Sequence, residues 1–243
     1  MIQEGADIID IGGESTSPGS EPVSISEELQ RVIPVIQMLR KYLGNNINLS
    51  IDTNKATVAE KALQAKADMV NSLGGFMFDK QLIAMVAKFQ CPIVIYHIQG
   101  KPKTMQEGKV AYGDVVKDIG AFFEEQVRIG ATKGIKREQF ILDPGIGFGK
   151  TVDQNIGIVK RLREFQTLNL PILIGVSRKS HLGIMLQTEL KLTNTPSPTE
   201  KLEASLAETA VAVLNGANIV RTHDVKQTKK FLSILDKFKT PHA

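Results

Sequence analysis

Short runs rich in Ile and Val alternate with longer amphipathic stretches from one end of this 243-residue chain to the other. The short runs are apolar at nearly every position, which is typical of strands buried on both faces of a parallel sheet. Strands are predicted at residues 8–11, 48–52, 69–71, 93–96, 140–142, 172–175 and 219–221. Helices are predicted at residues 26–42, 55–65, 80–88, 114–133, 153–163, 199–215 and 224–237.

This alternation predicts an α/β fold, and a closed TIM (β/α)₈ barrel is the leading architecture. An open doubly wound sheet is the alternative, but no glycine fingerprint follows the first strand and opens a helix, as dinucleotide binding requires. Only seven β/α units are visible, whereas a barrel needs eight. Residues 1–5 have the pattern of a last helical turn ended by Gly5. We therefore expect residues 1–243 to form a single, N-terminally truncated barrel domain, with one strand and most of one helix upstream.

The charges exclude some partners. Thirty basic and 26 acidic residues are spread along the chain without a clustered basic stripe, so nucleic-acid binding is not expected, and a small anionic molecule is favoured. The sequence lacks both a membrane-length apolar run and a signal peptide, so no membrane association is expected. The single cysteine, Cys91, is interpreted as a buried structural thiol and is consistent with a cytoplasmic protein.

Polar side chains follow every predicted strand at its carboxyl end, where barrel enzymes build their active sites. Asp52, Asn71, Asp143 and Lys179 provide two carboxylates, an amide and an ammonium, a set that suits the hydrogen-bonding edge of a flat heterocycle. A second set is suited to binding an anion: Arg178, Arg221, His223 and backbone N–H groups near Ser177 and Ser180.

Other candidate features have structural interpretations. The stretch "GIGFGK" lacks the spacing of a phosphate-binding loop, and its glycines are expected to form a tight turn after Asp143. His97 is expected to be structural, and His181 and His242 to lie on the surface. No zinc site is predicted from the histidine spacing.

Six motifs, in order, resemble those of the dihydropteroate synthase family: "DIIDIGGEST" with a following "PG", "SIDT", "YHIQGKPKTMQ", "LDPGIGFGKT", "SRKS" and "VRTHDV". The resemblance covers residues 5–225. It implies a pterin-binding barrel that joins 4-aminobenzoate to 6-hydroxymethyl-7,8-dihydropterin diphosphate in folate biosynthesis, with Mg²⁺ as cofactor and release of diphosphate. It also implies a target for sulfonamides and a homodimer formed near the carboxyl end, where Phe231, Leu232 and Leu235 form an apolar stripe.

The resemblance assigns roles to individual residues. Asp52, Asn71, Asp143 and Lys179 match the pterin pocket, and Arg221 and His223 match the diphosphate site. Thr16, Pro18, Phe148, Lys179 and Ser180 match positions around the aminobenzoate. Asp143, Lys179, Arg221 and His223 are the expected catalytic residues.

Two departures from the family pattern stand out. The family's first strand, which carries an Asn near the magnesium, is not in this sequence, so the metal ligands are left unassigned. Ser17 replaces the usual Arg of the first loop, which removes a charge-assisted contact of about 1.5 to 3 kcal/mol to an anionic substrate. These departures leave open a catalytically impaired member of the family. A pterin-dependent methyltransferase is a further alternative, although "SRKS" and "RTHDV" argue against it, because its substrate carries no diphosphate.

Overall fold

The chain is described by a computed structural model that covers residues 1–17, 19–103, 105 and 112–238. Pro18 and His242 lie outside the described residues. The strands are β1 (Ile8–Gly12), β2 (Asn48–Asp52), β3 (Met69–Leu73), β4 (Ile93–Tyr96), β5 (Phe140–Asp143), β6 (Leu173–Ile174) and β7 (Ile219–Val220). All seven predicted strands are present, and their bounds differ from the predicted ones by at most two residues at either end.

Helices follow the strands. They are α1 (Ile25–Leu43), α2 (Ala56–Gln64), α3 (Gln81–Phe89), α4 (Val115–Ala131), α5 (Val152–Lys160), α6 (Ser180–Glu189), α7 (Leu202–Leu214) and α8 (Val225–Leu235). Short 3₁₀ helices form at Ile2–Glu4, Arg137–Gln139, Leu162–Leu168 and Thr199–Lys201. The turn ahead of β1 ends at Gly5, whose φ of 97° matches the predicted glycine terminator. Helix α6 was not predicted.

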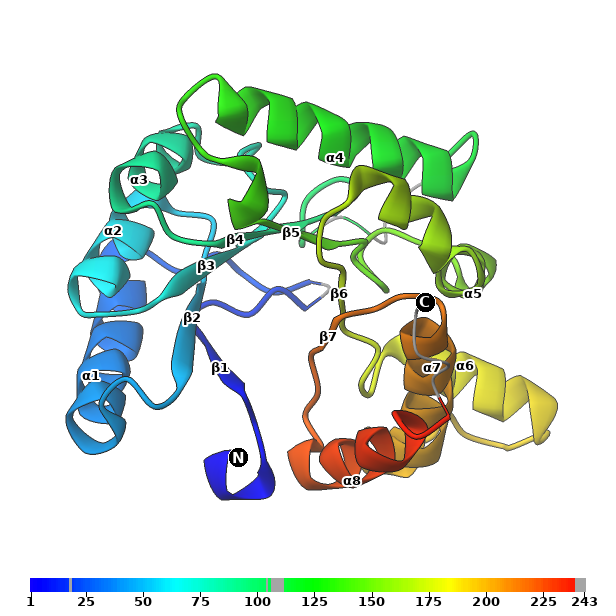
Figure 1. Cartoon of the computed structure of the whole chain (residues 1–243). Helices are drawn as coiled ribbons and strands as arrows, with labels where there is room; N and C mark the ends of the chain where they lie inside the picture. The colour runs from blue at the N-terminus through cyan, green and yellow to red at the C-terminus, as the bar shows by residue number, and fades with distance from the viewer. Residues whose placement is uncertain (18, 104, 106–111, 239–243) are drawn as a thin grey trace.

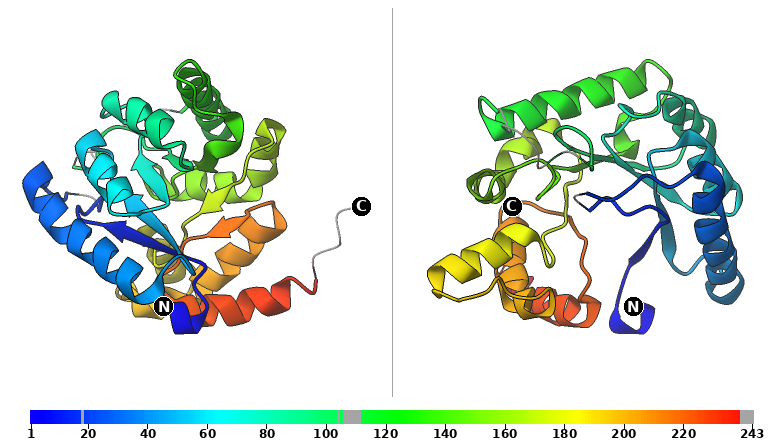
Figure 2. Two further views of the ribbon diagram at one scale, coloured as in Figure 1. Left: turned by 60° about the vertical axis from the view of Figure 1, so that its left-hand side comes forward. Right: turned by 180° about the vertical axis from the view of Figure 1, so that it is seen from behind.

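The strands are parallel and pair in chain order. Strands β1 to β5 form one sheet and β6 pairs with β7, while a bridge between Leu142 and Ile172 links the two sheets. In Figure 2 the helices lie around the outside of the strands, as in a barrel. Within the described part of the chain, β1 and β7 are the outer strands of this array. Ion pairs link the segments around these two strands: Lys229 on α8 pairs with Asp7 at 3.2 Å, and Arg221, directly after β7, pairs with Asp10 on β1 at 3.3 Å.

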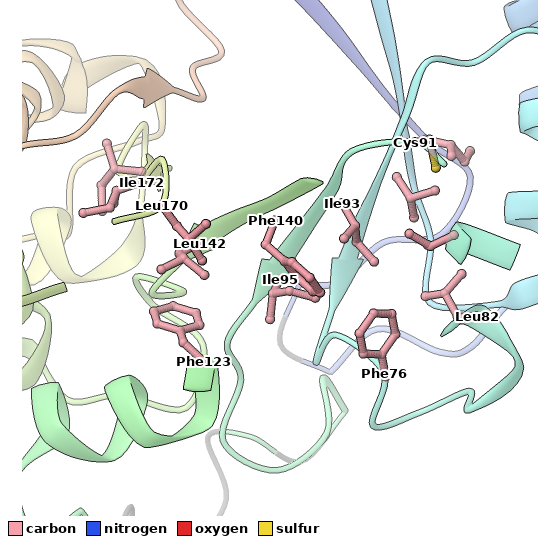
Figure 3. Close-up of a cluster of buried hydrophobic side chains, with 14 of the residues drawn as sticks. Phe76, Leu82, Cys91, Ile93, Ile95, Phe123, Phe140, Leu142, Leu170 and Ile172 are labelled. Carbon is pink, nitrogen blue, oxygen red and sulfur yellow. The ribbon is translucent and has the colours of Figure 1, made fainter. Parts of the chain in front are cut away.

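The main hydrophobic core lies between the strands and the helices. Figure 3 shows part of it, including Phe76, Ile95 and Phe140; the rings of Phe76 and Phe140 meet edge to face, with their centroids 6.5 Å apart. Cys91 belongs to this core, which confirms its predicted structural role. A smaller cluster of Met69, Val94 and Leu173 fills the inside of the strand array. Alternating side chains thus pack both faces of the strands.

Helix α1 begins differently from the prediction. It starts at Ile25, one residue before the predicted start, and Ser24 is its N-cap, whose hydroxyl accepts a hydrogen bond from the Glu27 N–H at 3.2 Å. None of the helices in the described ranges is long and apolar enough to cross a membrane.

Candidate active site

A cavity of about 1090 Å³ opens at the carboxyl ends of the strands and extends inward between β1 and β7. Its lining includes eight of the ten predicted site residues: Thr16, Asp52, Asn71, Phe148, Lys179, Ser180, Arg221 and His223. Asp143 lies just behind this lining, with 1 % of its surface exposed. The tenth residue, Pro18, is not described. The structure therefore gathers residues from both ends of the sequence at one site.

Arg221, which follows β7, lies at the centre of the site. Its guanidinium makes long contacts of 3.3 Å to Asp10, 3.4 Å to Asp52 and 3.4 Å to the Tyr96 hydroxyl. It also lies 5.1 Å from the centroid of the Tyr96 ring. Gly175 leaves room for this side chain, because a Cβ there would lie 3.4 Å from Arg221 Nε. Contacts of this length are weak, so the guanidinium can still engage an anionic ligand.

Asp52 and Asn71 form an acceptor-rich wall where β2 and β3 run side by side in register. Burial, followed by the charge of Asp10, raises the pKa of Asp52 to about 7, against the opposing effect of Arg221. The Asn71 amide donates to Asp10 at 2.9 Å. Its oxygen, Oδ1, is buried without a hydrogen-bond partner among the described residues. An unpaired buried acceptor is costly, so a ligand with an N–H donor would satisfy it.

Lys179 and Phe148 form the opposite wall. The Lys179 ammonium lies 4.1 Å from the centroid of the Phe148 ring. Burial, followed by the nearby Arg221 charge, lowers the pKa of Lys179 to about 7, while Asp143 acts to raise it. Burial also raises the pKa of Asp143, although Arg221 and the 2.8 Å hydrogen bond from the Gly145 N–H oppose this shift. A perturbed Lys and a perturbed Asp at one cavity are typical of a functional site.

Arg178 and His223, both predicted to bind an anion, line the cavity, but their side chains have different partners. His223 lines the cavity, and its Nδ1 lies 3.1 Å from the Ser177 hydroxyl. Arg178, in contrast, is engaged by Asp224 through two hydrogen bonds of 3.0 and 2.5 Å. The fork of Arg178 therefore fixes the loops after β6 and β7 to each other, and is not free for a ligand.

The expectation for His181 was also wrong. It is buried in the first turn of α6, with 2 % of its surface exposed, and its Nε2 lies 2.9 Å from the Glu208 carboxylate on α7. This pair fixes the start of α6 directly after Lys179. His97, by contrast, is buried as expected.

The loop after β1 is held at its base by a cluster of charges. Lys55 Nζ donates to Glu14 at 2.7 Å, to Glu28 at 2.5 Å and to the Val23 carbonyl at 2.7 Å. Burial acts to lower the pKa of Lys55, but the hydrogen bonds to both glutamates raise it overall. Glu14 also accepts from the Val23 N–H at 2.7 Å. The two ends of the loop that carries Thr16 and Ser17 are thus joined.

The loop after β5 packs against the loop after β4. Gly145 has a φ of 71°, and a Cβ there would lie 1.8 Å from the His97 carbonyl oxygen. A second close approach occurs at Gly149, which faces the Gln99 carbonyl. These contacts confirm that the glycines of "GIGFGK" form a tight turn and require the absence of a side chain.

We expect Gly145→Ala to destabilise the protein by about 3 kcal/mol or more, because the clash with backbone adds to the strain at positive φ. Gly134→Ala is the matched control, since Gly134 has a φ of 86° but nothing within 4 Å of its Cβ position. That variant should lose only about 1 kcal/mol. Urea unfolding of both variants measures the difference, and equal losses would mean that the packing against His97 is not tight.

Several site residues were missed by sequence reasoning. Lys150 lies inside the motif "LDPGIGFGKT", but no role was predicted for it. Glu14, Glu28, Lys55 and Glu208 act through partners that lie far away in the sequence. Of these residues, only Glu14 could have been recognised from the sequence, because it is a charged residue inside the loop that follows the first strand.

Comparison with known proteins decides the family. A family model described as "Pterin binding enzyme" matches residues 1–223. The chain belongs to the pterin-binding enzyme family. It is 45% identical over 236 residues to the dihydropteroate synthase of Synechocystis sp., covering 97% of this chain and 78% of that protein. It is 39% identical to the Escherichia coli dihydropteroate synthase, with 97% and 79% covered.

Solved structures of the pterin-binding family agree. The dihydropteroate synthase of Yersinia pestis in a sulfonamide drug complex superposes with a TM-score of 0.90 at 36% identity, covering 98% of this chain and 82% of that one. The Thermus thermophilus enzyme in complex with 4-aminobenzoate gives a TM-score of 0.85 at 33% identity, with 98% and 86% covered. The barrel fold is thereby confirmed, and the chain is a transferase of the dihydropteroate synthase group.

Proposed function

We propose that this chain condenses 4-aminobenzoate with 6-hydroxymethyl-7,8-dihydropterin diphosphate, giving 7,8-dihydropteroate and diphosphate in folate biosynthesis. The similar proteins are dihydropteroate synthases, and one related structure holds 4-aminobenzoate. The observation that carries the proposal is the acceptor-rich wall of the cavity, where the partly exposed Asp52 lies beside Asn71 and its unpaired oxygen, with the buried Asp143 close to Asp52.

That wall suits a pterin. A pterin ring presents several N–H donors along one edge, and carboxylates accept such parallel donors well. Asn71 can donate with its amide nitrogen and accept with its oxygen. We assign Asp52, Asn71 and Asp143 to the pterin, with Lys179 at its edge and Tyr96 close to Phe148 at the inner end of the site.

The opposite side of the cavity suits the leaving group and the amine. Arg221 and His223 would bind the diphosphate and stabilise the negative charge that it gains as the C–O bond breaks. Asp143 would stabilise the cationic methylene left on the pterin. The arylamine nitrogen then forms the new C–N bond and loses a proton. Phe148, Lys179, Ser180 and Thr16 would position the aminobenzoate, together with Pro18.

We also propose that Mg²⁺ binds together with the diphosphate group of the substrate. Among the residues described, no group of three or more His, Cys, Asp or Glu side chains could hold a metal ion. Magnesium is usually bound through one or two carboxylates together with substrate phosphates, so a single carboxylate of this chain would be enough to hold it beside the diphosphate. Asp10, which lines the cavity beside Arg221, would supply that carboxylate. Such an ion neutralises charge on the leaving group.

We also propose a homodimer and a cytoplasmic location. In the predicted apolar stripe, Leu232 and Leu235 pack on the core, so they do not form a free surface. The exposed apolar side chains near them are Val211 and Leu214 on α7, and Ile234 and Phe238 at the carboxyl end. These residues offer a surface that a second copy could cover.

Calorimetry with the dihydropterin diphosphate and Mg²⁺ tests the function. We expect the wild-type chain to bind, and Asp143→Asn and Lys179→Ala to bind about 10- to 100-fold more weakly, because each loses a charge-assisted hydrogen bond. Asp153→Asn, an exposed carboxylate on α5, should bind as the wild type does. Lack of binding by the wild type would contradict the proposed function, and normal binding by both site variants would mean that the pterin lies elsewhere.

A further inference from the structure

We propose that Lys150 is a positioning residue, whose ammonium joins the loop after β4 to the loop after β5 and so fixes Phe148 beneath Lys179. The proposal rests on the proposed function, because Phe148 is the wall assigned to the aminobenzoate. Lys150 is 4 % exposed and does not belong to the cavity lining. It can therefore act on the reaction only through other residues.

The geometry around Lys150 matches the donors of an ammonium group. Nζ lies 2.9 Å from the Gly145 carbonyl, 3.0 Å from the Phe148 carbonyl and 3.0 Å from His97 Nδ1. An ammonium has three N–H donors and no acceptor, so these three acceptors satisfy it completely. Burial lowers the pKa of Lys150 to about 7, while Asp143 acts to raise it and Lys179 to lower it. The three acceptors favour the protonated form within this balance.

His97 completes the arrangement as a neutral acceptor. Burial, followed by the charge of Lys150, holds the pKa of His97 well below its usual value. The ring is therefore neutral, and because the Lys150 ammonium can only donate, we infer that Nδ1 accepts and that the ring proton lies on Nε2. Its plane is fixed by an edge-to-face contact with Phe122, with the ring centroids 4.9 Å apart. His97 gives Lys150 a rigid anchor on the loop after β4.

Phe148 connects Lys150 to the cavity. Its carbonyl is one of the three acceptors, while its ring meets Tyr96 edge to face at 4.6 Å and lies 4.1 Å from Lys179 Nζ. Without the ammonium, the buried Phe148 carbonyl would lose this donor, while the Gly145 carbonyl would keep the 3.1 Å hydrogen bond from the Phe148 N–H, and the loop would rearrange to satisfy the Phe148 carbonyl. Small displacements of a substrate-positioning wall have large kinetic effects.

The test compares Lys150→Met with Lys160→Met, an exposed lysine at the end of α5. We expect Lys150→Met to raise the KM for 4-aminobenzoate at least tenfold, with kcat and the pterin Kd changed less than threefold. Asp52 and Asn71 make no hydrogen bond to Lys150, so most of the pterin site is unchanged, and the small change allowed in the pterin Kd reflects Asp143, whose charge acts on Lys150. Equal KM values in the two variants would overturn the proposal.

A second variant covers the case in which Lys150→Met does not fold. His97→Phe keeps the packing on Phe122 but removes one acceptor, and should raise the same KM by a smaller factor. Adding Lys150→Met to His97→Phe should cost less than Lys150→Met does alone, since the two residues act together. An unchanged KM in His97→Phe would count against the proposal.

Nuclear magnetic resonance of the unliganded protein supplies a readout that is independent of activity. We expect the His97 ring to be neutral with Nδ1 unprotonated, and the contact between the Phe148 and Tyr96 rings to be lost in His97→Phe or Lys150→Met. A His97 ring protonated on Nδ1 would overturn the proposal. Lack of condensation by the wild type would instead overturn the proposed function, while the ring contact still decides whether Lys150 fixes Phe148.

Discussion

Arg221→Met should lower kcat/KM for the condensation by about 10³-fold, as measured by the release of diphosphate. The loss of a single preorganised donor to a developing negative charge costs about 10²- to 10³-fold. Arg221 supplies several donors and also faces Asp10 and Asp52, which would repel an anionic substrate once the guanidinium is gone. We therefore expect an effect at the upper end of that range.

Two further substitutions make this result specific. Arg221→Lys keeps the charge but loses the planar fork, so it should recover only part of the activity. Arg128→Met removes an exposed arginine of α4 that pairs with Glu125, and should leave activity unchanged. If Arg221→Met keeps more than a tenth of the wild-type kcat/KM, the diphosphate does not bind at this residue.

Lys55→Met should lower the free energy of unfolding by about 3 to 5 kcal/mol, because removing one partner of a buried ion pair leaves the other charge uncompensated. Glu28 is 1 % exposed, and its second oxygen already has no partner in the described part of the chain. For a chain of this length, the loss corresponds to a fall in the melting temperature of about 10 °C. Calorimetric or circular-dichroism melting measures it.

The matched control is Lys88→Met, since Lys88 pairs with Glu60 at 2.8 Å but is 57% exposed. Exposed pairs contribute about 0 to 1 kcal/mol, so its melting temperature should stay within about 2 °C of the wild-type value. The double variant Lys55→Met with Glu28→Leu should regain part of the lost stability, because no charge is then left alone at Glu28. A Lys55→Met variant as stable as Lys88→Met would show that the cluster is solvated.

The strands and the pterin-side residues could be predicted from the sequence because their signals are local. Each strand is a continuous apolar run, and Asp52, Asn71 and Asp143 follow such runs directly. Helix α6 was missed because its signal is weak. It starts right after the polar "SRK" stretch, buries a histidine and includes Gly183, where a Cβ would lie 2.9 Å from Lys201.

The remaining misses are pairings between distant segments. His181 was expected on the surface because its partner, Glu208, is 27 residues away. Arg178 was assigned to an anion because Asp224, which engages it, lies 46 residues further on. Whether a charged side chain is free or already paired depends on tertiary contacts, and a single sequence does not contain them.

The cluster around Lys55 also lowers the conformational entropy that the loop after β1 loses when a substrate binds. Glu14 and Val23 are held together before any ligand arrives, so the segment between them is a closed loop whose ends do not need to be brought together. Ordering the backbone of one residue costs about 1 to 2 kcal/mol, and only the residues between Glu14 and Val23 remain to be ordered. A substrate that meets Ser17, where the family pattern has Arg, has fewer contacts with which to offset such a cost, and we expect the closed loop to keep that cost small.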